Sequence, residues 1–191
     1  MSKINSAAVF CGSSFPNDPV YIQKANELGR ALASSGIRLV YGGGYRGLMG
    51  TIAESVRDAG GKVTGVLPEF FDDPRVRMKS VEDELIITPG MHERKQKIYD
   101  LADAFIIFPG GIGTMDEFFE IFTWKQIGLH KKNIALYNVS GFFDTLLDFL
   151  HECTGKGFMR EEVMSSLIIS DDSEELIKLL ETKETVLPSK I

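Results

Sequence analysis

The sequence is poor in cysteine and histidine, with two cysteines and three histidines among 191 residues. Neither Cys11 nor Cys153 has the spacing of a metal site, and two cysteines make no disulfide framework. Both stand in apolar stretches, so we expect two buried thiols in a reducing compartment. The histidines show no ligand spacing either, and we expect His92, His130 and His151 at the surface or partly packed. The sequence therefore predicts no metal site.

Long hydrophobic runs are also missing. No apolar segment approaches the ~18 residues that a membrane-spanning helix needs. The apolar run Ala7–Cys11 near the start of the sequence is too short for the core of a secretory signal, so we expect a cytoplasmic location. The formal net charge of −6 disfavours nucleic acid and anionic membranes as partners, because both would repel the protein. A small molecule is the expected partner.

The composition is that of a folded globular protein, with 43% hydrophobic and 25% charged residues. The length suits one domain with one core, and no repeat, low-complexity tract or linker divides it. We therefore expect residues 1–191 to form a single domain.

Short apolar runs alternate with segments of helical period along the whole chain. The predicted strands are Ala7–Cys11, Ile37–Tyr41, Val63–Leu67, Leu85–Ile87, Ala104–Phe108, Ile134–Tyr137 and Leu167–Ile169. The predicted helices are Tyr21–Leu32, Leu48–Ala59, Met91–Ala102, Met115–Phe122, Phe142–Cys153 and Ser173–Glu181. Continuously apolar strands between helices predict an α/β fold, a doubly wound parallel sheet with helices on both faces. Ligands bind such sheets beyond the carboxyl ends of the strands, here in the turns after the first, second and fifth strands.

Two glycine-rich segments follow strands and lead into helices. They are Gly42–Gly50 and Pro109–Glu117. Glycine allows close backbone approach to a ligand, and the following helix offers unpaired N–H groups that suit a phosphate. The alternative is that both segments are tight turns that bind no ligand. Because both lie at the ligand-binding edge of the sheet, this alternative is disfavoured. Neither segment is a Walker loop or a dinucleotide fingerprint.

Glu117 has two interpretations. Thr114-x-x-Glu117 matches a capping box, in which the glutamate only binds a backbone N–H at a helix start. The local pattern is equally compatible with a catalytic carboxylate. Asp116 beside it could serve only the helix dipole.

A charged segment, Met91–Lys95, opens the helix after the fourth predicted strand. By itself it would be a solvated first turn. Because consecutive strands are often neighbours, we expect the fourth strand beside the fifth, which would place Arg94 and Lys95 next to the Pro109–Glu117 turn. A guanidinium there would suit a phosphate ester. Ser13, after the first strand, could bind a ligand or simply enter a helix.

These three segments, in this order, resemble the LOG ("lonely guy") family of cytokinin riboside 5′-monophosphate phosphoribohydrolases, whose bacterial members were long labelled possible lysine decarboxylases. The resemblance covers roughly Ala7 to Leu180 and rests on Gly42-Gly43-Gly44-x-x-Gly47-Leu48-Met49-Gly50, Met91-x-x-Arg94-Lys95 and Pro109-Gly110-Gly111-x-Gly113-Thr114-x-x-Glu117. It implies a Rossmann-like homodimer that cleaves AMP or N6-substituted AMP to a free base and ribose 5-phosphate.

The resemblance also implies site residues, with Arg94 and Glu117 as the catalytic pair and no cofactor. Together with the glycine turns, the expected substrate-binding residues are Ser13, Gly43, Gly44, Met91, Lys95, Gly110, Gly111, Gly113, Thr114, Met115, Asp116 and Thr123. Asp116 stands where family members often carry glutamate, which keeps the charge but shortens the reach. The segment Pro68–Asp83 is expected to border the base. The alternative function is a non-catalytic carrier or sensor of nucleotides or molybdenum cofactor.

Overall fold

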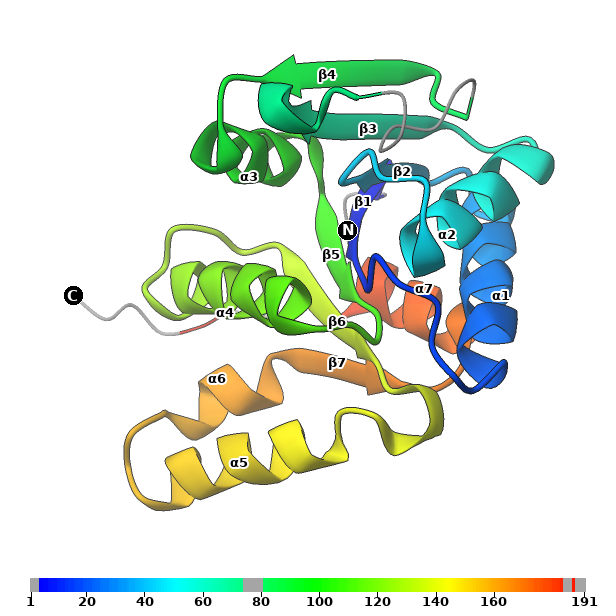
Figure 1. Ribbon diagram of the computed structural model, residues 1–191. Helices are drawn as coiled ribbons and strands as arrows, with labels where there is room; N and C mark the ends of the chain where they lie inside the picture. The colour runs from blue at the N-terminus through cyan, green and yellow to red at the C-terminus, as the bar shows by residue number, and fades with distance from the viewer. Residues whose placement is uncertain (1–3, 74–80, 184–186, 188–191) are drawn as a thin grey trace.

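The computed structural model describes residues 4–73, 81–183 and 187, and within them the strands form one parallel sheet (Figure 1). Its order is β4-β3-β2-β1-β5-β6-β7. The strands are β1 (Ser6–Phe10), β2 (Arg38–Tyr41), β3 (Val63–Pro68), β4 (Glu84–Thr88), β5 (Ala104–Ile107), β6 (Asn133–Tyr137) and β7 (Leu167–Ser170). The expected doubly wound α/β architecture is confirmed.

Helices cover both faces of the sheet (Figure 1). On one face lie α1 (Val20–Ser34), α2 (Gly47–Asp58) and α7 (Ser173–Thr182). On the other lie α3 (Met91–Leu101), α4 (Ile112–Gln126), α5 (Asp144–Gly155) and α6 (Glu161–Ser165). Two short 3-10 turns, η1 (Glu69–Phe71) and η2 (Val139–Gly141), follow β3 and β6.

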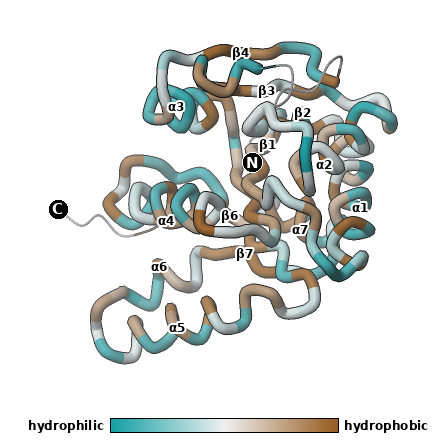
Figure 2. Tube along the Cα trace, in the orientation of Figure 1, coloured by the Kyte–Doolittle hydropathy of each residue, from teal (hydrophilic) through white to brown (hydrophobic). Residues whose placement is uncertain are grey.

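The strands are apolar on both faces because each face contributes to a separate core. In β1, Ala7 and Val9 pack toward α1, α2 and α7, whereas Ala8 and Phe10 pack toward α3 and α4. This alternation follows from the two-residue period of a strand. Figure 2 shows the hydrophobic centre of the sheet between helices of mixed hydropathy. Each large apolar side chain buried in this way contributes about 1.5–3 kcal/mol to folding.

The neighbour predicted for the fourth strand is wrong. β4 lies at one edge of the sheet beside β3, and β5 pairs with the central strand β1. The chain returns from the edge to the centre through α3, so consecutive strands are not adjacent at this point. The reversal of strand order consequently lies between β1 and β5, and the turns after β1, β2 and β5 meet there as expected.

Several local expectations also need correction. α4 begins at Ile112, earlier than expected, because Gly111 ends the extended backbone. The short helix α6 was not predicted, since five residues carry too little periodicity. Cys153 is only partly buried, and Cys11 keeps some exposed surface although its thiol is enclosed. His130 is buried, with its Nε2 2.8 Å from the carbonyl oxygen of Ile121. No helix of the described residues is long and apolar enough to cross a membrane.

Candidate active site

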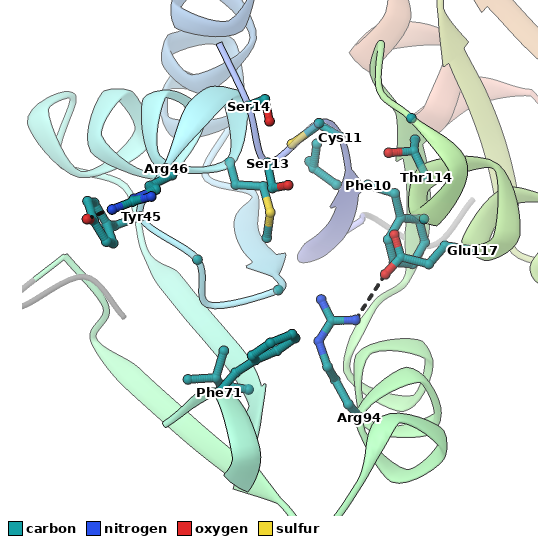
Figure 3. Close-up of a pocket in the computed structure, with 18 of the residues that line it drawn as sticks. Phe10, Cys11, Ser13, Ser14, Tyr45, Arg46, Phe71, Arg94, Thr114 and Glu117 are labelled. Atoms are coloured by element: carbon teal, nitrogen blue, oxygen red, sulfur yellow. Dashed lines mark hydrogen bonds and ion pairs between the residues drawn. The ribbon is translucent and has the colours of Figure 1, made fainter. Parts of the chain in front are cut away.

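A cavity of about 940 Å³ lies at the carboxyl edge of the sheet, where the order of the strands reverses (Figure 3). The turns after β1, β2 and β5 surround it, together with η1 and the first turns of α3 and α4. Its polar side chains are Ser13, Ser14, Tyr45, Arg46, Asp73, Arg94, Thr114 and Glu117. The rest of the lining is backbone and apolar side chains, a mixture typical of small-molecule sites.

Arg94 and Glu117 form an ion pair inside this cavity (Figure 3). Arg94 Nη1 donates to Glu117 Oε1 at 3.0 Å, and Arg94 Nε donates to the carbonyl oxygen of Val66 at 3.1 Å. The two side chains are only 10% and 13% exposed. Strand β3 therefore fixes the guanidinium, and these two hydrogen bonds leave both N–H groups of Nη2 and the second N–H of Nη1 for other partners.

The contacts of Glu117 exclude the capping interpretation. The residue before α4 is Gly111, and no side chain caps the helix there. Thr114 is already the third helical residue, so Glu117 stands beyond the first turn, out of reach of the backbone groups that a capping box satisfies. Its carboxylate instead meets Arg94 from the neighbouring helix. The sequence pattern was compatible with both arrangements, and the point at which the helix begins separates them.

Burial and charge act in opposite directions on Glu117. Burial raises the pKa of its carboxyl group above the usual range, while Arg94 and, more weakly, Lys95 counteract this rise. Asp116 adds to the rise. Burial and the neighbouring Glu117 together raise the pKa of the Cys11 thiol, so this cysteine is protonated at neutral pH and is no nucleophile.

The glycines of the turn after β2 and those of the turn before α4 have different surroundings. A Cβ atom on Gly42 would collide with Arg94 Nη2, and Gly43 and Gly47 have φ angles of 72° and 63°. Packing and backbone conformation of the protein itself therefore require these glycines. At Gly111 and Gly113, by contrast, a Cβ would meet nothing within 4 Å, and neither has a positive φ. The turn before α4 thus has open space over its backbone, which a ligand can fill.

The structure places half of the expected substrate-binding residues in the lining of the cavity. These are Ser13, Gly44, Met91, Gly111, Gly113 and Thr114, which join Arg94 and Glu117 there. Outside the lining lie Gly43, Lys95, Gly110, Met115, Asp116 and Thr123. Gly43 and Gly110 shape the turns, because a Cβ on Gly110 would collide with Thr114 Oγ1. Thr123 is exposed, more than one helical turn beyond Glu117 on α4.

Lys95 and Asp116 contact each other. Lys95 Nζ lies 2.8 Å from Asp116 Oδ2 and 3.4 Å from Glu120 Oε1, between α3 and α4. Lys95 was expected beside the Pro109–Glu117 turn, which contains Asp116, but no local pattern in the sequence indicates an ion pair between the two residues.

Several other residues of the lining were not among the expected site residues, including Tyr45, Arg46, Met49 and Leu67. The first three belong to the glycine-rich segment after β2, so their place within that motif was the available signal. Phe70 and Phe71 line the cavity, as expected for the segment Pro68–Asp83. Residues 74–80 of that segment lie outside the described residues.

Comparisons with known proteins agree on one family. A family model described as "Possible lysine decarboxylase" matches residues 49–180. The cytokinin riboside 5′-monophosphate phosphoribohydrolase LOG of Oryza sativa subsp. japonica is 41% identical over 94% of this chain and 74% of its own length. The enzyme of that name from Rhodococcoides fascians is 41% identical over 88% of this chain and 85% of its own.

Solved structures show the same fold at lower sequence identity. The molybdenum cofactor binding protein of Rippkaea orientalis has a TM-score of 0.70 at 19% identity and covers 95% of this chain and 98% of its own. The Moco carrier protein of Chlamydomonas rheinhardtii has a TM-score of 0.69 at 22% identity, covering 95% and 100%. These likenesses concern the fold alone, whereas the relatives at about 40% identity share the chain almost from end to end. The chain therefore belongs to the LOG family of phosphoribohydrolases, which are nucleotide N-glycosidases.

Proposed function

We propose that this protein hydrolyses the N-glycosidic bond of AMP or N6-substituted AMP, releasing the free base and ribose 5-phosphate. The observation that carries the proposal is the buried Arg94–Glu117 pair, which faces a cavity that the glycine turn at the start of α4, the helix of Glu117 itself, also lines. The relatives are named as phosphoribohydrolases of cytokinin riboside 5′-monophosphates, which supports the same reaction.

The 5′-phosphate binds at the turn from Gly111 to Thr114. The first amides of α4 have no carbonyl partners within the helix, and the helix dipole is positive at this end. The open space over Gly111 and Gly113 lets phosphate oxygens approach these amides closely. The glycines of the other turn serve internal packing, which favours this turn as the phosphate site.

The ribose lies between the phosphate site and the ion pair. Cleavage passes through a transition state with positive charge at C1′. The Glu117 carboxylate stabilises that charge or orients the attacking water, and Arg94 holds the carboxylate and contributes Nη2 to the substrate. Water supplies the hydroxyl group to C1′ and a proton to the departing base, so the reaction needs no further reactant.

The base faces the apolar part of the cavity. Met49, Leu67, Phe70, Phe71 and Met91 line this part. The rings of Phe70 and Phe71 are packed with their centroids 4.6 Å apart and are 59% and 46% exposed, so both have surface available for a flat base. An alkyl group on N6 also fits an apolar wall, which supports N6-substituted AMP as a substrate.

The description "Possible lysine decarboxylase" finds little support in the site. Lysine decarboxylation with pyridoxal phosphate needs a lysine amine in the cavity to hold the cofactor. Lys125 is buried, and burial lowers its pKa to about 8, but it lies near the far end of α4. Its Nζ donates to the carbonyl oxygen of Lys132 and does not line the cavity. Among the described residues that line the cavity there is no lysine, so they do not fit this cofactor.

Incubation of the protein with AMP and with N6-isopentenyl-AMP tests the proposed reaction. We expect free base and ribose 5-phosphate in equal amounts, separated by chromatography, and no release from the corresponding nucleosides, which lack the phosphate. Tight nucleotide binding without any released base would favour the alternative of a non-catalytic carrier.

We further propose that the protein is a homodimer that uses the exposed side of α4. Phe119 is 40% exposed on this helix, and Leu129, shortly after its end, is 63% exposed. Apolar side chains of this size gather at interfaces between subunits. Sedimentation equilibrium should give twice the mass of one chain, and Phe119→Glu should shift it toward a single chain. A single-chain mass for the unaltered protein would contradict the proposal.

A further inference from the structure

Two cations of α3, Arg94 and Lys95, form ion pairs with carboxylates of α4. Arg94 and Lys95 are consecutive residues of α3, and their partners on α4 are Glu117 for Arg94, and Asp116 and Glu120 for Lys95. Neighbouring residues of a helix point about 100° apart, so only one of the two can face the cavity. Arg94 does, whereas Lys95 lies outside the lining with its side chain 14% exposed.

The contacts of Lys95 bracket Glu117 on its own helix. Asp116 precedes Glu117 directly and Glu120 follows it by three residues, so Lys95 binds the helix on both sides of the carboxylate. Rotation or sliding of α4 against α3 would stretch both contacts and would also carry Glu117 away from Arg94. The Lys95 amine already has two acidic partners, which leaves it poorly placed to bind a nucleotide phosphate.

We propose that Lys95 is a positioning residue, which fixes α4 against α3 through Asp116 and Glu120 so that the Glu117 carboxylate stays aligned with Arg94 in the cavity. The proposal rests on the proposed function insofar as it concerns the reaction. It assigns to Lys95 a role other than the nucleotide contact that the family resemblance implies.

The charges around Glu117 give this role a measurable signature. Arg94 and Lys95 face it from α3, Asp116 and Glu120 stand beside it on α4, and Cys11 approaches from the end of β1. Lys95 lowers the pKa of Glu117 and Asp116 raises it. Loss of Lys95 should therefore raise this pKa, and loss of the Asp116 charge should lower it, although both substitutions break the same ion pair.

The first test follows the Glu117 carboxyl carbon by ¹³C NMR as a function of pH, with the signal assigned from Glu117→Gln. We expect its titration to move to higher pH in Lys95→Met and to lower pH in Asp116→Asn. Lys95→Arg should titrate like the unaltered protein, because the cation is retained. Lys97→Met, the same substitution two residues further along α3, is the matched control and should change nothing. Identical titrations of the unaltered protein and Lys95→Met would overturn the proposal.

The second test separates positioning from substrate binding. With AMP, Lys95→Met should lower kcat by about threefold or more on the acidic side of the pH profile and leave KM within about twofold of its original value. Lys95→Arg should restore kcat. A large rise in KM at every pH, with kcat unchanged, would instead identify Lys95 as a nucleotide ligand and refute the positioning role.

The two tests also keep this inference separate from the proposed function. The NMR titration needs no turnover, so it decides the effect of Lys95 on Glu117 even in a protein that fails to cleave AMP. Failure of the unaltered protein to release base from any nucleotide would count against the proposed function alone. The partners Asp116 and Glu120 are 57% and 27% exposed, so water can solvate them when the amine is removed, and Lys95→Met should remain folded.

Discussion

Replacement of Glu117 by glutamine should lower the rate of base release from AMP by about a hundredfold or more. Glutamine has nearly the same shape and can still accept the hydrogen bond from Arg94 Nη1 through its amide oxygen. It lacks the negative charge that would stabilise the developing cation at C1′. Initial rates at saturating AMP, followed by chromatography of free adenine, measure this loss directly.

The pH dependence of the unaltered protein provides a companion observation. The active form carries an ionised Glu117, and burial raises the pKa of this group above the usual range. Activity should therefore fall as the pH decreases through that raised pKa, and Glu117→Gln should lack this acidic decline. Glu93→Gln, an exposed glutamate in the first turn of α3, is the matched control and should retain the rate of the unaltered protein. A folded Glu117→Gln protein that releases adenine at the full rate would remove Glu117 from the mechanism.

The cost of this substitution in stability should be checked in the same preparation. Arg94 is 8% exposed, and without a carboxylate partner its charge is less well compensated. Thermal unfolding with and without Glu117→Gln shows whether enough folded protein remains at the assay temperature. A rate corrected for the folded fraction then reports on chemistry alone.

The architecture could be predicted from the sequence because local patterns determine it. Strands such as β5 are apolar at every position, and α1 has a clear apolar face and is followed by Gly36, whose φ is 69°. The adjacency of the strands could not be predicted in the same way. Whether β5 lies beside β4 or returns to β1 depends on where α3 crosses the sheet, and no local pattern encodes that path.

The candidate site shows the same division between local and distant information. The turn Gly111–Thr114, which we propose binds the phosphate, belongs to one of the two glycine-rich segments that the sequence offers as phosphate sites. Arg94 does lie close to Glu117, but the strand adjacency from which the sequence predicts this is wrong. The two residues meet because α3 and α4 lie on the same face of the sheet. The family resemblance implies that Lys95 binds the nucleotide. Its contacts with Asp116 and Glu120 could not be predicted, because they depend on how two helices pack and the sequence does not give their orientation.

Gly42→Ala should reduce the rate of base release about as strongly as loss of Arg94 itself, although Gly42 contributes no side chain. The new Cβ would collide with Arg94 Nη2 and would lie 3.3 Å from Arg94 Cζ and 2.6 Å from Met49 Cε. The backbone at Gly42 is not left-handed, so alanine is allowed there and the effect comes from the collision alone. A displacement of about 1 Å in a catalytic group can cost about a hundredfold in rate, and kcat with AMP measures it.

A double-mutant cycle with Arg94→Ala identifies the cause of that loss. If Gly42→Ala acts by displacing the guanidinium, it should have little further effect once the guanidinium is absent, so the two losses should be strongly non-additive. Gly155→Ala is the matched control, because a Cβ there meets nothing within 4 Å and its φ is not positive. That control should leave kcat unchanged. Fully additive losses from Gly42→Ala and Arg94→Ala would mean that Gly42 acts on the substrate or the fold by another route, and that the position of Arg94 does not depend on the missing side chain.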